Sequence, residues 1–218
     1  KQQTEQAQKN AEKAQAVADK KMAEATSERM EIAKDKQKLL SQALADEQDR
    51  NSADGIMIVD EKKQLASLVK VDSNTGNIIY QSPVKVIRGR TVIPVKDKSA
   101  KPKTVGFVAV CGETTGANSA VRLCYIDSQA LEIKAESNEI VYENSVLVED
   151  GGYFYCVIKS GNSYYLAKYD EDMNLIQKSA AAVKKDTPIM VTDKGIIVTN
   201  STSKVILLNG ESLSVVSQ

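Results

Sequence analysis

Hydrophobic and polar residues follow a regular pattern over residues 153–192, where the chain gives its clearest structural signal. Four short apolar runs lie at residues 153–159, 164–169, 175–178 and 188–192, and segments rich in Gly, Asn, Asp and Ser separate them. Short runs of β-branched and aromatic residues bounded by such segments are typical of β-strands. The pattern therefore predicts four antiparallel strands in this stretch.

Related units recur through the rest of residues 53–218. The other expected strands are 56–59, 65–71, 78–80 and 91–95, then 105–111, 121–126, 131–134 and 145–148, and finally 196–199, 205–208 and 213–216. A recurring unit of four strands is typical of β-propeller blades. The expected fold class is mainly β with a long N-terminal helix, and its four propeller-blade-like, four-stranded antiparallel units end in an incomplete one.

The second strand of each unit ends in a turn residue. Aligned there, the units read LVKVD, LCYID, LAKYD and VILLN, and the turn residues are Asp72, Asp127, Asp170 and Asn209. The side-chain oxygen of Asp or Asn at such a position accepts hydrogen bonds from backbone N–H groups that follow it. These four residues are therefore expected to shape turns.

Residues 1–52 have a different composition, because the first fifty residues contain no Gly and no Pro and are rich in Ala, Lys, Glu and Gln. Such a segment predicts one long helix. Met30, Ala33, Leu40 and Leu44 follow the spacing of a coiled-coil seam. A solvated helix, a dimeric or trimeric coiled coil and a helix docked on the strands all remain open. Residues 51–55 are expected to form a turn that separates two domains, 1–52 and 53–218.

Charge and composition exclude several classes of function. Lys plus Arg and Asp plus Glu both number 29, so that no net charge favours nucleic acid as a partner. The chain contains no His, which removes the commonest general base and metal ligand and disfavours hydrolases and metalloenzymes. No apolar run is long enough for a transmembrane segment. Because the chain begins at Lys1, we expect a mature form or an excised piece of a longer protein.

Metal sites and disulfides receive little support from the sequence. Asp170, Asp172 and Asn174 have the spacing of the first calcium ligands in an EF-type loop, but Leu175 occupies the position that requires Gly. The three Cys residues are too few for a zinc site without His. If residues 112–119 connect two paired strands, Cys111 faces Ala120 and Cys124 faces Phe107, which places the sulfurs about 13 Å apart. We expect free, mostly buried thiols.

Two loops and a group of tyrosines are candidates for a binding surface. The loop at residues 112–120 is rich in small polar residues, and the insert at residues 96–103 is basic. Functional loops often sit on a rigid β scaffold, although solvated, mobile connections are the simpler interpretation. The candidate residues are Lys98, Lys101, Lys103, Thr114, Thr115, Asn118, Tyr153 and Tyr164.

Two resemblances extend this interpretation. Residues 68–81, LVKVDSNTGNIIYQ, resemble the repeat of pyrroloquinoline-quinone-type propellers, with Tyr80 where that family commonly has Trp. The layout of a Lys/Glu/Ala/Gln-rich segment followed by residues 143–179, ENSVLVEDGGYFYCVIKSGNSYYLAKYDEDMNLIQKS, resembles the large spirochaetal antigens of the eighty-three/one-hundred-kilodalton family. The second resemblance implies a periplasmic or cell-surface location.

The resulting hypothesis is a non-enzymatic protein-interaction scaffold or antigen-type binding module on a helical stalk, with no cofactor and an unidentified protein partner. The alternative is a fragment of a quinone-dependent dehydrogenase. An incomplete last unit would leave an open β edge, so we expect self-association through that edge or through a coiled coil of residues 22–44. The expected core includes Phe107, Leu123, Val157, Leu166, Val191 and Ile197.

Overall fold

The computed structural model describes residues 34, 51–116 and 120–217. The expected long helix therefore lies outside the described residues, apart from Lys34 and the last two residues of its predicted range. At that end the prediction is wrong, because a β-strand begins at Ser52, within the segment expected to be a turn. The β region forms one compact unit, Asp54–Gln218. The predicted division into domains 1–52 and 53–218 stays a prediction.

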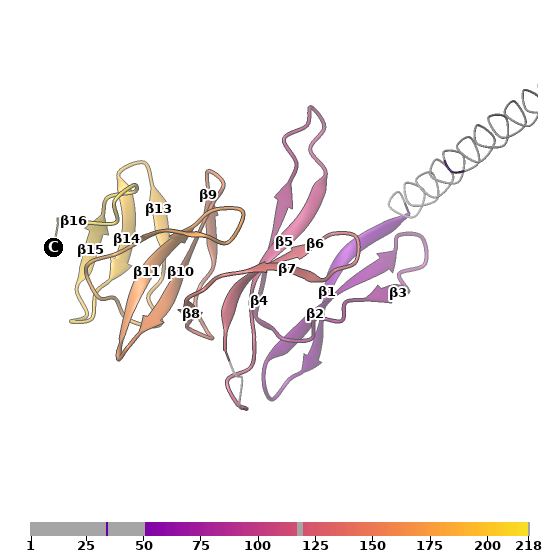
Figure 1. The fold of residues 1–218 in the computed structure, drawn as a ribbon, viewed down its shortest axis with the longest axis horizontal. Coiled ribbons are helices and arrows are strands. Elements are labelled where there is room, and N and C mark those ends of the chain that lie inside the picture. Colours follow the sequence, from indigo (N-terminus) through magenta and orange to yellow (C-terminus); the bar gives the residue numbers. More distant parts are fainter. Residues whose placement is uncertain (1–33, 35–50, 117–119, 218) are drawn as a thin grey trace, which may run out of the picture. The chain divides into compact units, whose positions relative to one another are not determined.

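The described β region consists of short antiparallel strands in three sheets (Figure 1). The strands of the first sheet are β1 (Ser52–Asp60), β2 (Leu65–Asp72), β3 (Ile78–Gln81), β4 (Ile87–Lys96), β5 (Thr104–Cys111), β6 (Arg122–Asp127) and β7 (Ile133–Glu136). Those of the second are β8 (Ile140–Val141), β9 (Val148–Asp150), β10 (Tyr153–Ser160), β11 (Ser163–Tyr169) and β12 (Leu175–Lys178). The third contains β13 (Met190–Thr192), β14 (Gly195–Thr199), β15 (Val205–Leu208) and β16 (Val215–Ser217).

The predicted grouping of strands into four propeller blades is wrong. The described residues form sheets of seven, five and four strands, and they do not form a closed propeller. The main reason is β4, which is longer than expected. Ile87 and Arg88 at its start pair with β2, whereas residues 92–96 pair with β5. The first two expected units are therefore joined in one sheet. The last sheet is complete, with β13 to β16 in order.

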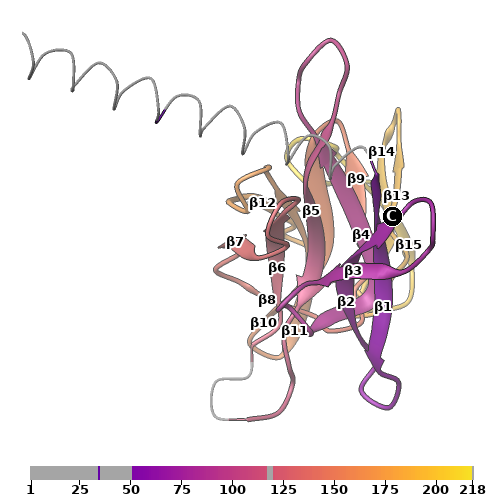
Figure 2. The same ribbon diagram turned by 90° about the vertical axis from the view of Figure 1, so that its right-hand side faces the viewer.

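Alternation along the strands fills three separate cores. The first core joins the β2 side of the seven-stranded sheet to β5 and β6, and contains Leu68 and Ile126. The second joins β5 and β6 to the five-stranded sheet, and contains Leu123 and Phe154. The third joins the five-stranded sheet to the last sheet, and contains Leu166. We therefore describe four layers, β1–β3, β4–β7, β8–β12 and β13–β16, and Figure 2 shows them one behind another.

The predicted core residues divide into two groups. Phe107, Leu123, Val157 and Leu166 are buried as predicted. Val191 and Ile197 are only half-buried, so the prediction is wrong for them. For Ile197 the reason is alternation, because its neighbours Ile196 and Val198 turn into the third core and Ile197 lies on the opposite face of β14.

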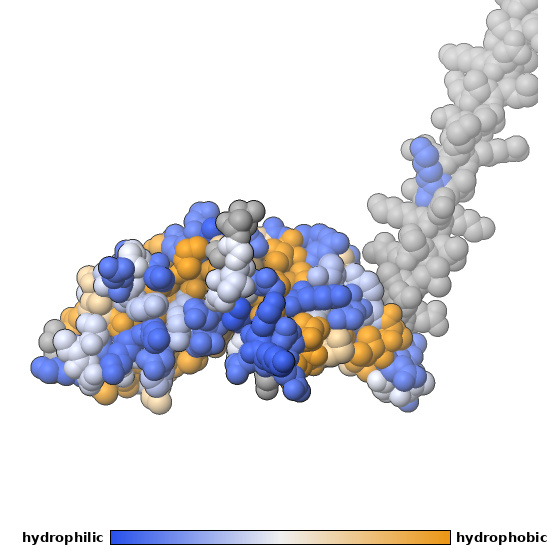
Figure 3. Space-filling view, turned by 90° about the horizontal axis from the view of Figure 1, so that it is seen from below, coloured by the Kyte–Doolittle hydropathy of each residue, from blue (hydrophilic) through white to orange (hydrophobic). Residues whose placement is uncertain are grey.

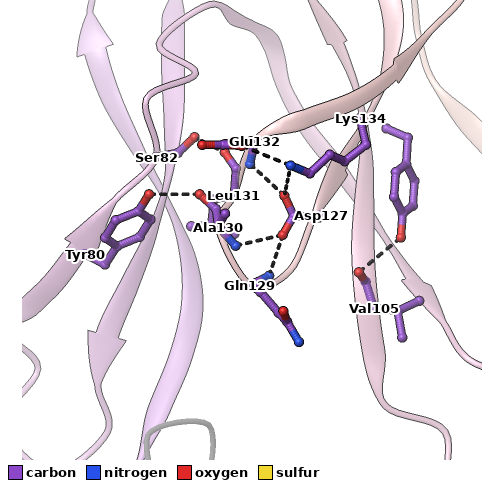
Figure 4. A network of polar contacts seen from close by, with 10 residues as sticks. Tyr80, Ser82, Val105, Asp127, Gln129, Ala130, Leu131, Glu132 and Lys134 are labelled. Carbon is purple, nitrogen blue, oxygen red and sulfur yellow. Dashed lines mark hydrogen bonds and ion pairs between the residues drawn. The ribbon is translucent and has the colours of Figure 1, made fainter. Parts of the chain in front are cut away.

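The turn residues bind the backbone of their own turns. The Asp72 carboxylate accepts hydrogen bonds from the N–H groups of residues 74 and 75, and that of Asp170 accepts them from residues 172 and 174. The side chain of Asn209 accepts bonds from residues 211 and 212. Asp127 accepts three backbone bonds, from residues 129, 130 and 132, and also pairs with Lys134 at 3.8 Å (Figure 4). Burial acts to raise the pKa of Asp127, but these N–H groups outweigh it and lower the pKa.

Contacts beside the Asp127 turn tie the first two layers together. The Tyr80 hydroxyl donates to the Ala130 carbonyl at 2.9 Å, and the Ser82 hydroxyl donates to the Leu131 carbonyl (Figure 4). Both donors belong to the chain following β2, and both acceptors belong to the turn between β6 and β7. The turn is therefore part of the contact between layers.

The expected register of β5 and β6 is wrong. Cys111 pairs with Arg122 and Cys124 pairs with Ala109, so the two Cys residues are offset by two positions rather than four. The connection is two residues longer than expected, because Cys111 pairs with Arg122 instead of Ala120 and residues 112–121 join the two strands. Both thiols lie in the first core and are free, as is the buried Cys156. Contact with Cys111, followed by burial, raises the pKa of the Cys124 thiol, and burial raises that of Cys156.

We expect these thiols to react slowly with a disulfide reagent at pH 8. The thiolate is the reactive form, and the raised pKa values of Cys124 and Cys156 reduce its population while burial blocks access. Reaction of the native protein should be at least roughly 100-fold slower than that of the protein unfolded in guanidinium. Three rapidly reacting thiols in the native protein would contradict the described packing.

Candidate binding surfaces

Apolar side chains reach the surface of the β region at several places between charged ones (Figure 3). Most are single residues, which are common on protein surfaces. In the last sheet, however, the pairing of strands brings several of them onto one face. Met190 pairs with Ile197, Ile197 pairs with Leu207, and Val205 pairs with Thr199. Paired residues project to the same side of a sheet. We call this side the outward face of the last sheet.

The outward face carries no charged side chain on β13, β14 or β15. Its positions on these strands are Met190, Thr192, Gly195, Ile197, Thr199, Val205 and Leu207. Met190 is 61% exposed and Val205 is 66% exposed, and Ile197 and Leu207 are half-buried. A sheet face that meets water normally carries polar and charged residues. Charge depletion combined with exposed apolar area is typical of an interface.

The repeat explains why this face is apolar. Val205 occupies the position of Leu123 and Leu166 in the units LCYID and LAKYD. Leu123 is buried against the third layer and Leu166 against the fourth, and both are 0% exposed. The outward face is thus built from the positions that the next layer covers elsewhere. In the described residues no further layer covers Val205.

A groove of about 560 Å³ lies between the five-stranded sheet and the last sheet. Its walls come from β10, β11, the turn joining β13 to β14, and the turn after β15. Lys168 on β11 is only 8% exposed there. Its Nζ lies 4.1 Å from the centre of the Tyr153 ring and 5.9 Å from that of Tyr155, and it donates to the Gly210 carbonyl at 3.2 Å.

The rim of the groove is acidic. Its titratable groups, other than the tyrosines, are Asp150, Lys168, Asp193, Lys194 and Glu211. Lys194 pairs with its neighbour Asp193 at 3.3 Å, where both side chains are exposed. Burial raises the pKa of Tyr155, with smaller contributions from Asp150, Tyr153 and Glu149. The groove therefore combines a buried ammonium group with carboxylates nearer the solvent.

The structure distributes the predicted binding residues over separate places. Tyr153 lies in the groove beside Lys168. Thr114 and Tyr164 line a second groove of about 330 Å³, where Tyr164 packs edge-on against Tyr142 at 5.6 Å. Lys98 lies in a third groove and pairs with Glu171 at 3.9 Å. The remaining exposed candidates are Lys101, Lys103 and Thr115. Asn118 lies outside the described residues.

Lys168 was not among the residues expected from the sequence. The signal was present, because alternation in LAKYD places Lys168 on the same face as Leu166, which is the face that turns toward the next layer. A Lys side chain in that position must either be buried between the layers or bend away toward the solvent. Among the residues that the structure describes, no group of His, Cys, Asp and Glu has the arrangement of a metal site.

Comparison with known proteins identifies one family. A profile described as Borrelia P83/100 protein matches residues 1–189. This match supports the expected resemblance to the large spirochaetal antigens, and therefore an antigen-type protein; it gives no support to the pyrroloquinoline-quinone-type resemblance. No curated protein sequence matches the chain. Over the described residues, no helix is both long and apolar enough to cross a membrane.

Solved structures add little to the family match. The chain is 10% identical to the computationally designed Ika8 protein, with a TM-score of 0.42. The similarity covers 76% of this chain and 48% of the designed one, so the chain spans about half the length of that protein.

Proposed function

The chain belongs to the Borrelia P83/100 protein family, and from this premise we propose that it is a non-enzymatic scaffold whose molecules associate through the outward face of the last sheet. The observation that carries the proposal is the uncharged, apolar composition of that face across β13, β14 and β15. Met190 at the start of β13 and Val205 at the start of β15 are more than half exposed. Covering such a face removes apolar area from water without burying a charge.

The proposed occupant of the face is the same face of a second copy. Within the chain, the equivalent positions Leu123 and Leu166 are covered by another sheet of the same repeat. The surface that fits Val205 is therefore a twisted apolar sheet of this kind, and each copy carries one. Two such faces related by a twofold axis form a self-complementary contact. We therefore propose association through this sheet face instead of the association through an open β edge that was expected from the sequence.

Sedimentation equilibrium of the whole chain tests the proposal. We expect a reversible monomer–dimer equilibrium, and Val205→Asp should raise the dimer dissociation constant at least roughly 100-fold because each dimer would bury two carboxylates. Ile176→Asp is the matched control, since Ile176 is 48% exposed on β12 of another sheet. This control variant should associate like the parent chain.

Three results would contradict the proposal. The parent chain could be monomeric at all concentrations, in which case the face has another occupant. Val205→Asp and the parent chain could associate equally, in which case the contact lies elsewhere, such as the coiled coil predicted for residues 22–44. If Val205→Asp and the control Ile176→Asp both lose association, the interface cannot be assigned to the outward face.

The family membership also supports a surface or extracytoplasmic protein. We propose the periplasm or the cell surface as its location. Labelling of intact cells and of cells with a permeabilised outer membrane by a membrane-impermeant amine reagent would distinguish the two compartments. If the protein is labelled only after the inner membrane is lysed, both locations are contradicted.

A further inference from the structure

Lys168 is a buried residue whose ammonium group has no carboxylate partner in the described part of the chain. The residue is 8% exposed, and among the described residues no Asp or Glu oxygen lies within ion-pair distance of its Nζ. Its contacts are one hydrogen bond to the Gly210 carbonyl and the faces of two tyrosine rings. One of the three N–H donors of the ammonium group is thus used by this hydrogen bond.

A buried charge without a counter-ion is costly, and buried charges are usually paired. The Tyr153 ring reduces the cost, because a cation over an aromatic face is stabilised by the ring electrons. The Gly210 carbonyl contributes a neutral acceptor only. An anionic group from a ligand would complete the surroundings of Lys168, which lines a groove with space for one.

The rim limits which anions fit. Asp150 and Glu211 are exposed acidic residues of the groove, and no ion pair to either is present in the described part of the chain. Glu211 directly follows Gly210, the residue that accepts the Lys168 hydrogen bond. Two such carboxylates repel a multiply charged anion such as phosphate, and they attract a positive group carried by the same ligand.

We propose that this groove binds a small zwitterion of the amino-acid type, whose carboxylate pairs with Lys168 and whose positive group lies toward Asp150 and Glu211. The groove volume of about 560 Å³ is within the range of small-molecule sites. Tyr153, which is 39% exposed, supplies an aromatic wall beside the carboxylate. Thr192 and Gly195 belong to both surfaces, but the groups proposed to hold the ligand, Lys168, Asp150 and Glu211, lie outside the outward face.

Titration of the isotope-labelled whole chain by ¹H–¹⁵N NMR tests this assignment. The probes are L-arginine, L-argininamide, which lacks the carboxylate, and inorganic phosphate. L-Arginine should shift the amide signals of Gly195, Gly210 and Glu211 in a saturable way below about 10 mM. L-Argininamide and phosphate should bind at least tenfold more weakly. Equal binding of L-argininamide, tighter binding of phosphate, or no saturable shift with L-arginine would each overturn the proposal.

Lys168→Met keeps the apolar stem and removes the charge, and it should weaken L-arginine binding at least tenfold. Lys98→Met is the matched control, because the Lys98 side chain is 88% exposed in another groove. If Lys168→Met does not fold, Glu211→Gln replaces it and should also weaken L-arginine binding. Unchanged binding in the folded Lys168→Met would show that Lys168 serves only the packing of the layers, and unchanged binding in Glu211→Gln would overturn the proposed role of the acidic rim.

Discussion

Replacement of Leu166 by Ala is expected to lower the free energy of unfolding by about 2–5 kcal/mol. Leu166 is 0% exposed and lies in the third core, between the five-stranded sheet and the last sheet. It pairs with Val157 on β10, which is also fully buried. Truncation would leave a cavity lined by two sheets whose strands are held by hydrogen bonds and cannot close over it.

Urea denaturation followed by circular dichroism measures this loss. Leu175→Ala is the control, because Leu175 at the start of β12 is 36% exposed and its truncation should change the free energy by less than about 0.5 kcal/mol. Equal effects of the two substitutions would show that the third core does not enclose Leu166.

Replacement of Gly195 by Ala is expected to cost about 2–4 kcal/mol. Gly195 begins β14 with φ +134°, a conformation that residues with a Cβ rarely adopt. An added Cβ would lie 2.2 Å from the Leu208 carbonyl oxygen on the neighbouring strand β15. That oxygen belongs to the backbone of a paired strand, so the strand itself would have to move.

Gly161→Ala separates the two causes of this loss. Gly161 also has a positive φ, +60°, but an added Cβ would meet nothing within 4 Å. Its substitution should therefore cost only the backbone strain of about 1–2 kcal/mol. If both substitutions reduce stability equally in the same urea experiment, the close approach of Gly195 to Leu208 contributes nothing.

The local parts of the fold could be predicted from the sequence. Residues 175–178 and 205–208 are strands with the expected bounds. The turn residues at the ends of β2, β6, β11 and β15 accept backbone hydrogen bonds in their turns. These features depend on alternation over a few residues and on a side chain that bonds its own turn, so a short stretch of sequence contains the necessary information.

The pairing of distant strands could not be predicted in the same way. The run at residues 91–95 was expected to be the last strand of the first unit, but β4 pairs with β5 and makes only a short contact with β2. Each partner would satisfy the backbone of such a strand equally well. The choice depends on packing in the first core, where Ile87 meets residues of β2, β5 and β6. This packing joins residues that are far apart in the sequence, so the local pattern of residues does not predict it.

The two candidate surfaces follow from that same layering. Alternation alone places Leu166 and Lys168 on one face of β11, but it does not show which layer the face meets. Val205 has the pattern of a core residue and is 66% exposed because no layer beyond β13–β16 covers it in the described residues. The sequence could therefore indicate unusual residues, whereas their exposure or burial depends on the order of the layers.

The contact between two copies through the outward face of the last sheet can be tested most directly by isotope-filtered NOE spectroscopy on a mixed sample. One half of the whole-chain protein would carry ¹³C-labelled methyl groups and the other half none. The proposed dimer predicts intermolecular NOEs from the methyl groups of Met190, Ile197, Val205 and Leu207 to unlabelled protons of the same face. A dimeric sample without intermolecular NOEs at these four residues would contradict the assignment of the interface.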